Sequence, residues 1–100
     1  MTIKLVKRPP NGVLLKLEGR LDTISAPSAR EAFLKVADEY ADITLDFTAL
    51  AYISSAGLRA LLTLQKQVNR TGATLTLTNV NSSVMEVFEM TGFNGMLNIV

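Results

Sequence analysis

Apolar side chains alternate with other residues in two runs near the start of the chain, at residues 2–7 and 13–18. This two-residue period is typical of half-buried strands. The segment between them, Pro-Pro-Asn-Gly at residues 9–12, contains the Asn-Gly dipeptide that favours tight hairpin turns. We therefore expect the two runs to form an antiparallel hairpin.

Three later segments carry apolar residues three and four positions apart, which is the spacing of one face of a helix. They span residues 26–41, 55–72 and about 82–92. The second and third segments reach glycines, Gly72 and Gly92, and glycine commonly terminates a helix. The pattern predicts three amphipathic helices.

Apolar or β-branched runs predict three more strands, at residues 43–47, 73–79 and 96–100. The resulting order is β-β-α-β-α-β-α-β. Strands that alternate with helices pair in parallel through right-handed crossovers, while the opening hairpin adds one antiparallel pair. We expect one α/β domain over residues 1–100, with a mixed, mainly parallel sheet and helices packed on it.

The composition excludes several classes of function. The chain has no cysteine and no histidine, which excludes disulfides, a Ser-His-Asp triad and a His-ligated zinc site within it. Ten basic residues are scattered and balanced by nine acidic ones, so no nucleic-acid binding is expected. Asp22 and Asp46 form a weak candidate pair for a metal, but a loop cap and a solvated strand-end charge explain them better. No metal and no cofactor are expected.

The N-terminal residues do not predict a signal peptide. Their apolar run is too short and too charged for a signal peptide. No apolar run in the chain approaches the length of a membrane span. We expect a cytoplasmic protein that does not insert directly into a membrane.

Two hydroxyl side chains, Ser54 and Ser55, stand where the second helix should begin. The N–H groups of a first helical turn lack partners within the helix, so a hydroxyl can cap them and a phosphate would be stabilised there. Ser55 and Gly57 also match part of the nucleophile-elbow pattern of hydrolases, but no histidine is available as a base. A helix cap and a chemically modified site both remain open.

Three segments together resemble the STAS domain family of anti-sigma-factor antagonists. They are residues 18–22, 45–62 (which include Ile-Ser-Ser-Ala-Gly-Leu) and 77–93, and they cover nearly the whole chain in the family's order. The resemblance implies a STAS-like domain with helices on one side of the sheet, acting as a binding module and not as an enzyme. The implied partners are an anti-sigma factor with serine kinase activity and a serine phosphatase.

The resemblance also implies a switch. In this family the kinase phosphorylates a serine at the start of the second helix, and the modified domain releases its partner. The position before Ala-Gly-Leu makes Ser55 the implied acceptor. Many members carry an aspartate just before the acceptor, whereas this chain has Ser54, which makes Ser54 a candidate competing acceptor.

The implied partner-binding surface joins the start of the second helix to the loop after the second strand and to a residue after the fourth. It comprises Asp22, Thr23, Ser54, Ser55, Gly57, Leu58, Arg59 and Asn79. Leu58 supplies apolar contact area if it is exposed, and only packing if it is buried. Arg59, one helical turn after Ser55, either neutralises a phosphate, meets an acidic partner or stays solvated.

Two other classes of function remain open. A STAS-like domain can serve as an accessory subunit of a membrane transporter complex, in which the serine is not phosphorylated. A nucleotide-binding or hydrolytic role is weaker, because the chain has neither of the glycine-rich phosphate-binding motifs.

Overall fold

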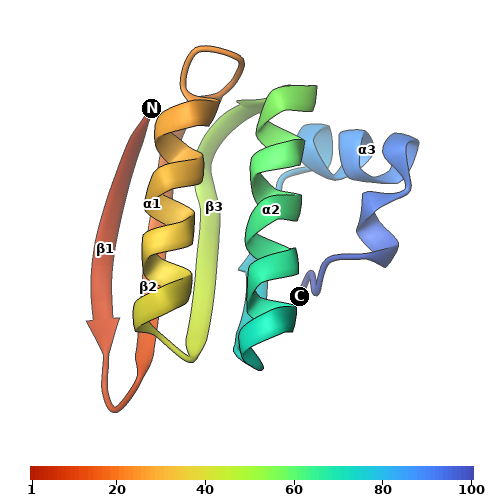
Figure 1. Ribbon diagram of the computed structural model, residues 1–100. Coiled ribbons are helices and arrows are strands. Elements are labelled where there is room, and N and C mark those ends of the chain that lie inside the picture. Colours follow the sequence, from red (N-terminus) through yellow and green to blue (C-terminus); the bar gives the residue numbers. More distant parts are fainter.

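The computed structural model describes residues 1–100 and contains four strands, three α-helices and one short 3-10 helix (Figure 1). In chain order these are β1 (Thr2–Arg8), β2 (Gly12–Leu21), α1 (Ala26–Glu39), β3 (Asp42–Ile53), α2 (Ser55–Thr71), β4 (Thr74–Thr78), α3 (Ser82–Thr91) and the 3-10 helix η1 (Phe93–Gly95). The predicted hairpin and the three predicted helices are all present.

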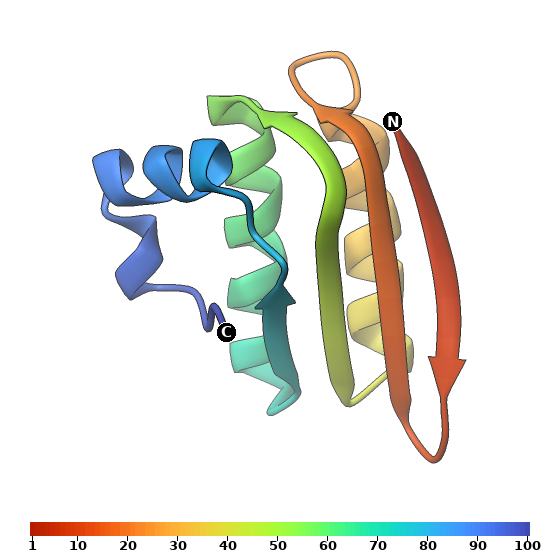
Figure 2. The same cartoon turned by 180° about the vertical axis from the view of Figure 1, so that it is seen from behind.

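The strands form one mixed sheet in the order β1-β2-β3-β4 (Figure 2). β1 and β2 are antiparallel, whereas the β2–β3 and β3–β4 pairs are parallel. α1 and α2 lie side by side on one face of the sheet, and α3 lies beyond β4 (Figures 1 and 2). The expected mainly parallel α/β sheet with helices on one side is confirmed.

None of the helices combines the length and the apolar character needed to cross a bilayer.

One apolar core fills the space between the sheet and the helices. Alternate residues of β2 and β3, such as Leu15 and Leu45, point into it and are almost wholly buried. At the α3 end, the ring of Phe88 meets the ring of Phe47 edge-on, with 6.2 Å between centroids. No polar or charged residue is buried as a whole.

β2 and β3 are longer than the sequence pattern predicts. β3 continues to Ile53 instead of ending at Phe47, and β2 continues to Leu21. Register shifts between the two strands break the two-residue period, so that Leu50 and Ile53 are both buried although they are three positions apart. The residues after Phe47, which we expected to form a connection, therefore belong to β3. Only Ser54 separates the end of β3 from the start of α2.

The predicted last strand, at residues 96–100, is reduced to a single parallel bridge between Ile99 and Leu77 of β4. The Leu77 N–H donates to the Asn98 carbonyl at 2.9 Å, and the Val100 N–H donates to the Leu77 carbonyl at 3.0 Å. The chain leaves α3 through η1 and reaches β4 only at Asn98, so few residues run alongside it.

Candidate functional site

The loop that follows β2 and the start of α2, which follows β3, lie next to each other at the carboxyl ends of these two parallel strands. Leu21, the last residue of β2, pairs with Ile53, the last residue of β3. The Ser54 N–H donates to the Leu21 carbonyl at 2.9 Å. Two parts of the expected surface, the loop at residues 22–25 and the start of α2, are therefore neighbours.

The two serines at the start of α2 have different environments. Ser54 is the N-cap, and its Oγ accepts a hydrogen bond from the Gly57 N–H at 3.2 Å. Its carbonyl accepts from the Leu58 N–H at 2.9 Å. Ser55 is the first helical residue, its side chain is exposed, and its hydroxyl makes no hydrogen bond within the chain. Ser55 thus presents a free hydroxyl beside the positive end of the helix dipole.

Gly57 and Leu58 do not face solvent, which corrects their expected place in the partner-binding surface. Leu58 is 2% exposed and belongs to the core, so it contributes packing and no contact area. Gly57 is buried where α2 approaches the strand ends. A Cβ there would lie 2.6 Å from the Leu21 carbonyl oxygen and 2.9 Å from Cγ1 of Ile53. Both residues fix the position of the helix start.

Asp22 organises its own loop. Its Oδ1 accepts hydrogen bonds from the Ile24 N–H at 3.1 Å and from the N–H and Oγ of Ser25 at 3.0 and 3.2 Å. The Ser25 N–H above all, and then the Ser25 hydroxyl, the Ile24 N–H and the Arg20 charge, hold the pKa of Asp22 below its ordinary value, although desolvation opposes this. The carboxylate stays ionised and engaged in the loop, so Thr23 and Ile24 are the exposed residues.

Ile24 provides an exposed apolar side chain that the sequence pattern did not single out. It is 89% exposed, on a loop held by the hydrogen bonds of Asp22. The preceding residue, Thr23, is also exposed and borders the start of α2. Ile24 thus offers an exposed apolar side chain, which Leu58 does not, and it lines a pocket with Met1, Ile3 and Ser28 on the β1 side of α1. In the sequence, only the place of Ile24 in a short loop between a strand and a helix could have indicated that its side chain is exposed.

Asn79 does not join the serines, which corrects the expected surface at a second point. Its Nδ2 donates to Oδ1 of Asp46 at 3.0 Å. Asp46 precedes Ser54 by eight residues of β3, roughly 25 Å of extended chain. Its neighbours Leu45 and Phe47 are buried, so by alternation Asp46 lies on the face opposite the helices. Asp46 and Asp22 are held in separate hydrogen-bond networks.

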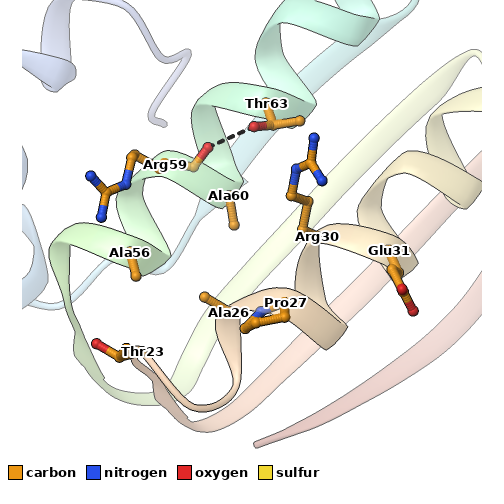
Figure 3. A pocket seen from close by; sticks show the side chains of 9 residues that line it. All are labelled: Thr23, Ala26, Pro27, Arg30, Glu31, Ala56, Arg59, Ala60 and Thr63. Carbon is orange, nitrogen blue, oxygen red and sulfur yellow. Dashed lines mark hydrogen bonds between the residues drawn. The ribbon is translucent and has the colours of Figure 1, made fainter.

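A groove of about 500 Å³ runs between the N-terminal halves of α1 and α2, next to the loop at residues 22–25 (Figure 3). Small side chains make up much of its lining, and one arginine stands on each helix, Arg30 on α1 and Arg59 on α2. The sequence did not single out Arg30, because helical periodicity does not show which helix faces meet. The lining residues are Thr23, Ala26, Pro27, Arg30, Glu31, Ala56, Arg59, Ala60 and Thr63.

The fold and this site define a small α/β module that presents an exposed serine at the start of a helix. The family model of the STAS domain matches residues 3–100, and the chain therefore belongs to the STAS domain family. The family that its sequence motifs indicated is thus confirmed. An anti-sigma-B factor antagonist of Bacillus subtilis (strain 168) is 29% identical over 94 residues, which are 94% of this chain and 86% of that protein.

Solved structures share the fold at lower identity. An anti-sigma factor antagonist from Mycobacterium paratuberculosis matches with a TM-score of 0.86 and 17% identity, over 98% of this chain and 83% of that one. The antagonist SpoIIAA matches with a TM-score of 0.77 in both its unphosphorylated and its phosphorylated form, at 17% and 18% identity. Those matches cover 99% of this chain and 87% and 91% of the SpoIIAA chains. At such identities the likeness concerns the fold alone.

Proposed function

We propose that this protein is an anti-sigma-factor antagonist. It binds an anti-sigma factor that is also a serine kinase, and it is released when that kinase phosphorylates Ser55. A serine phosphatase restores the binding form. Membership of the STAS family and the 29% identical antagonist support this role. The observation that carries the assignment is the free, exposed hydroxyl of Ser55 beside a Ser54 that caps the helix.

The local geometry favours Ser55 over Ser54 as acceptor. A kinase must bring the acceptor oxygen in line with the γ-phosphate of ATP, which requires access from solvent. The Oγ of Ser54 is half-buried and occupied by the Gly57 N–H, so its phosphorylation would remove the cap of α2. The hydroxyl of Ser55 can be modified without breaking any hydrogen bond within the chain.

A phosphate on Ser55 acts at the interface and leaves the fold intact. It adds about −1.5 to −2 charges and three acceptor oxygens, which the N-terminus of α2 stabilises. In an interface that had closed over Ser55, an uncompensated charge costs about 3–5 kcal/mol. That cost weakens binding by roughly two to three orders of magnitude or more. Release therefore needs no refolding of the domain.

The test is to mix the protein with ATP and the serine-kinase anti-sigma factor encoded in the same genome, and then to measure intact mass. We expect one added phosphate, lost in Ser55→Ala and retained in Ser54→Ala. Incubation with ATP alone should add nothing, which separates this role from a nucleotide-processing one. A phosphate that survives in Ser55→Ala contradicts the assignment. No modification together with tight binding to a transporter ATPase would establish the accessory role instead.

A further inference from the structure

The two arginines of the α1–α2 groove have no acidic partner within the chain. The two ion pairs of the structure are Lys4–Glu18 and Arg20–Asp22, and neither includes Arg30 or Arg59. Glu31 is the one acidic residue that lines the groove, and in Figure 3 its carboxylate points away from Arg30. Two guanidinium groups, both on exposed residues, therefore border a concave surface that is free to bind an anion.

The walls of the groove suit a peptide segment. Ala26, Ala56 and Ala60 contribute only methyl groups, so a partner backbone can approach the helices closely. In Figure 3 the guanidinium of Arg30 points toward Thr63, while the side chain of Arg59 extends away from Arg30, on the side of Ala56. The two cations thus serve different positions along the groove. Planar guanidinium groups bind carboxylates through paired, charge-assisted hydrogen bonds.

We infer that the α1–α2 groove receives an acidic segment of the anti-sigma factor, with Arg30 and Arg59 as its two cationic contacts. The inference rests on the proposed function and extends the partner surface from the start of α2 into the groove. Continuity supports it, because Thr23 of the exposed loop and Ala56, the residue after Ser55, both line the groove.

The groove also connects phosphorylation to release. Arg59 follows Ser55 by four residues, so the two side chains lie on the same face of α2, one turn apart. A phosphate on Ser55 competes with partner carboxylates for Arg59, and its charge repels any carboxylate that remains in the groove. The same modification thereby disrupts the interface around Ser55 and displaces the acidic segment of the partner from the groove.

The experiment measures the dissociation constant of the unphosphorylated protein for the serine-kinase anti-sigma factor, without ATP, at several salt concentrations. Arg30→Gln and Arg59→Gln remove the charge from exposed, unpaired side chains, so thermal unfolding should stay as in the wild type. Arg70→Gln is the matched control, since Arg70 is an exposed α2 arginine outside the groove. We expect Kd to rise about five- to tenfold for each groove variant, with a weaker salt dependence, and to stay unchanged for Arg70→Gln.

The outcomes separate the two proposals. If the wild type binds the kinase and Ser55 is phosphorylated, but Arg30→Gln behaves like Arg70→Gln, the groove inference is wrong and the proposed function stands. If the wild type binds no such kinase, the proposed function fails and the groove inference fails with it. A salt dependence that is identical in wild type and in Arg30→Gln also overturns the inference, whatever the absolute affinity.

Discussion

The Oγ of Ser54 accepts a hydrogen bond from the Gly57 N–H at 3.2 Å, and this contact divides the tasks of two adjacent serines. Ser54 is committed to capping α2, while Ser55 leaves its hydroxyl in solvent. The end of the neighbouring strand β2 helps to position both, since the Ser54 N–H donates to the carbonyl of Leu21. Stability and modification are therefore separable by mutation.

Ser54→Ala should destabilise the protein, and Ser55→Ala should not. Loss of an N-cap oxygen leaves the Gly57 N–H without its acceptor and costs about 1 kcal/mol. For a domain of this size that lowers Tm by roughly 4–8 °C. Ser55→Ala removes an exposed hydroxyl without a partner and should stay within about 0.5 kcal/mol of the wild type. Urea unfolding of the two variants checks this, and equal losses of stability would contradict the division of roles.

Gly57→Ala should destabilise the protein because the site has no room for a Cβ. The new atom would lie 2.6 Å from the Leu21 carbonyl oxygen and 2.8 Å from Cγ of Leu21, which forces the start of α2 away from the sheet. Overpacking of this kind costs about 1–3 kcal/mol. Gly95→Ala is the control, since a Cβ there meets no atom within 4 Å. Thermal unfolding should separate the two variants clearly, and similar melting temperatures would rule out the close approach.

Ile24→Ala should weaken partner binding without affecting folding. The side chain is 89% exposed, so the core loses nothing, whereas a preorganised apolar side chain that a partner buries can contribute more than about 1 kcal/mol to binding. We expect Kd for the kinase to rise about tenfold. Met90→Ala is the matched control, because Met90 is 80% exposed but lies on α3. Equal affinities of the two variants would place Ile24 outside the interface.

Asp46→Asn should lower stability at neutral pH and reduce its acid dependence. The Thr48 hydroxyl above all, and then the Thr48 N–H, the Asn79 amide and the Lys16 charge, hold the pKa of Asp46 below its ordinary 3.8, against the effect of desolvation. The folded protein therefore binds fewer protons at this site than the unfolded chain does. The resulting stabilisation is present above about pH 4 and is lost as the pH falls through the folded pKa. Urea unfolding between about pH 7 and about pH 2 should show the wild-type advantage shrinking in acid; a constant difference would contradict this.

Much of the fold follows from local patterns in the chain. The helical spacing in α1 and α2 and the alternation in β2 and β4 predicted these elements, because each buries one face on a single core. The pattern failed where long-range geometry altered the period. The bulged end of β3 breaks the alternation, and the last residues form one bridge because η1 intervenes before the chain reaches β4.

By itself, the sequence determined the order of the elements from β1 to α3, the family motifs and the position of Ser54 and Ser55 at a helix start, since all of these depend on spacing along the chain. Only the tertiary structure decided which of these residues meet. It buried Leu58, placed Asn79 against Asp46, exposed Ile24 and brought Arg30 and Arg59 to the same groove. These outcomes depend on how two helices and two strand ends pack together, and residues far apart in sequence carry no local signal of such contacts.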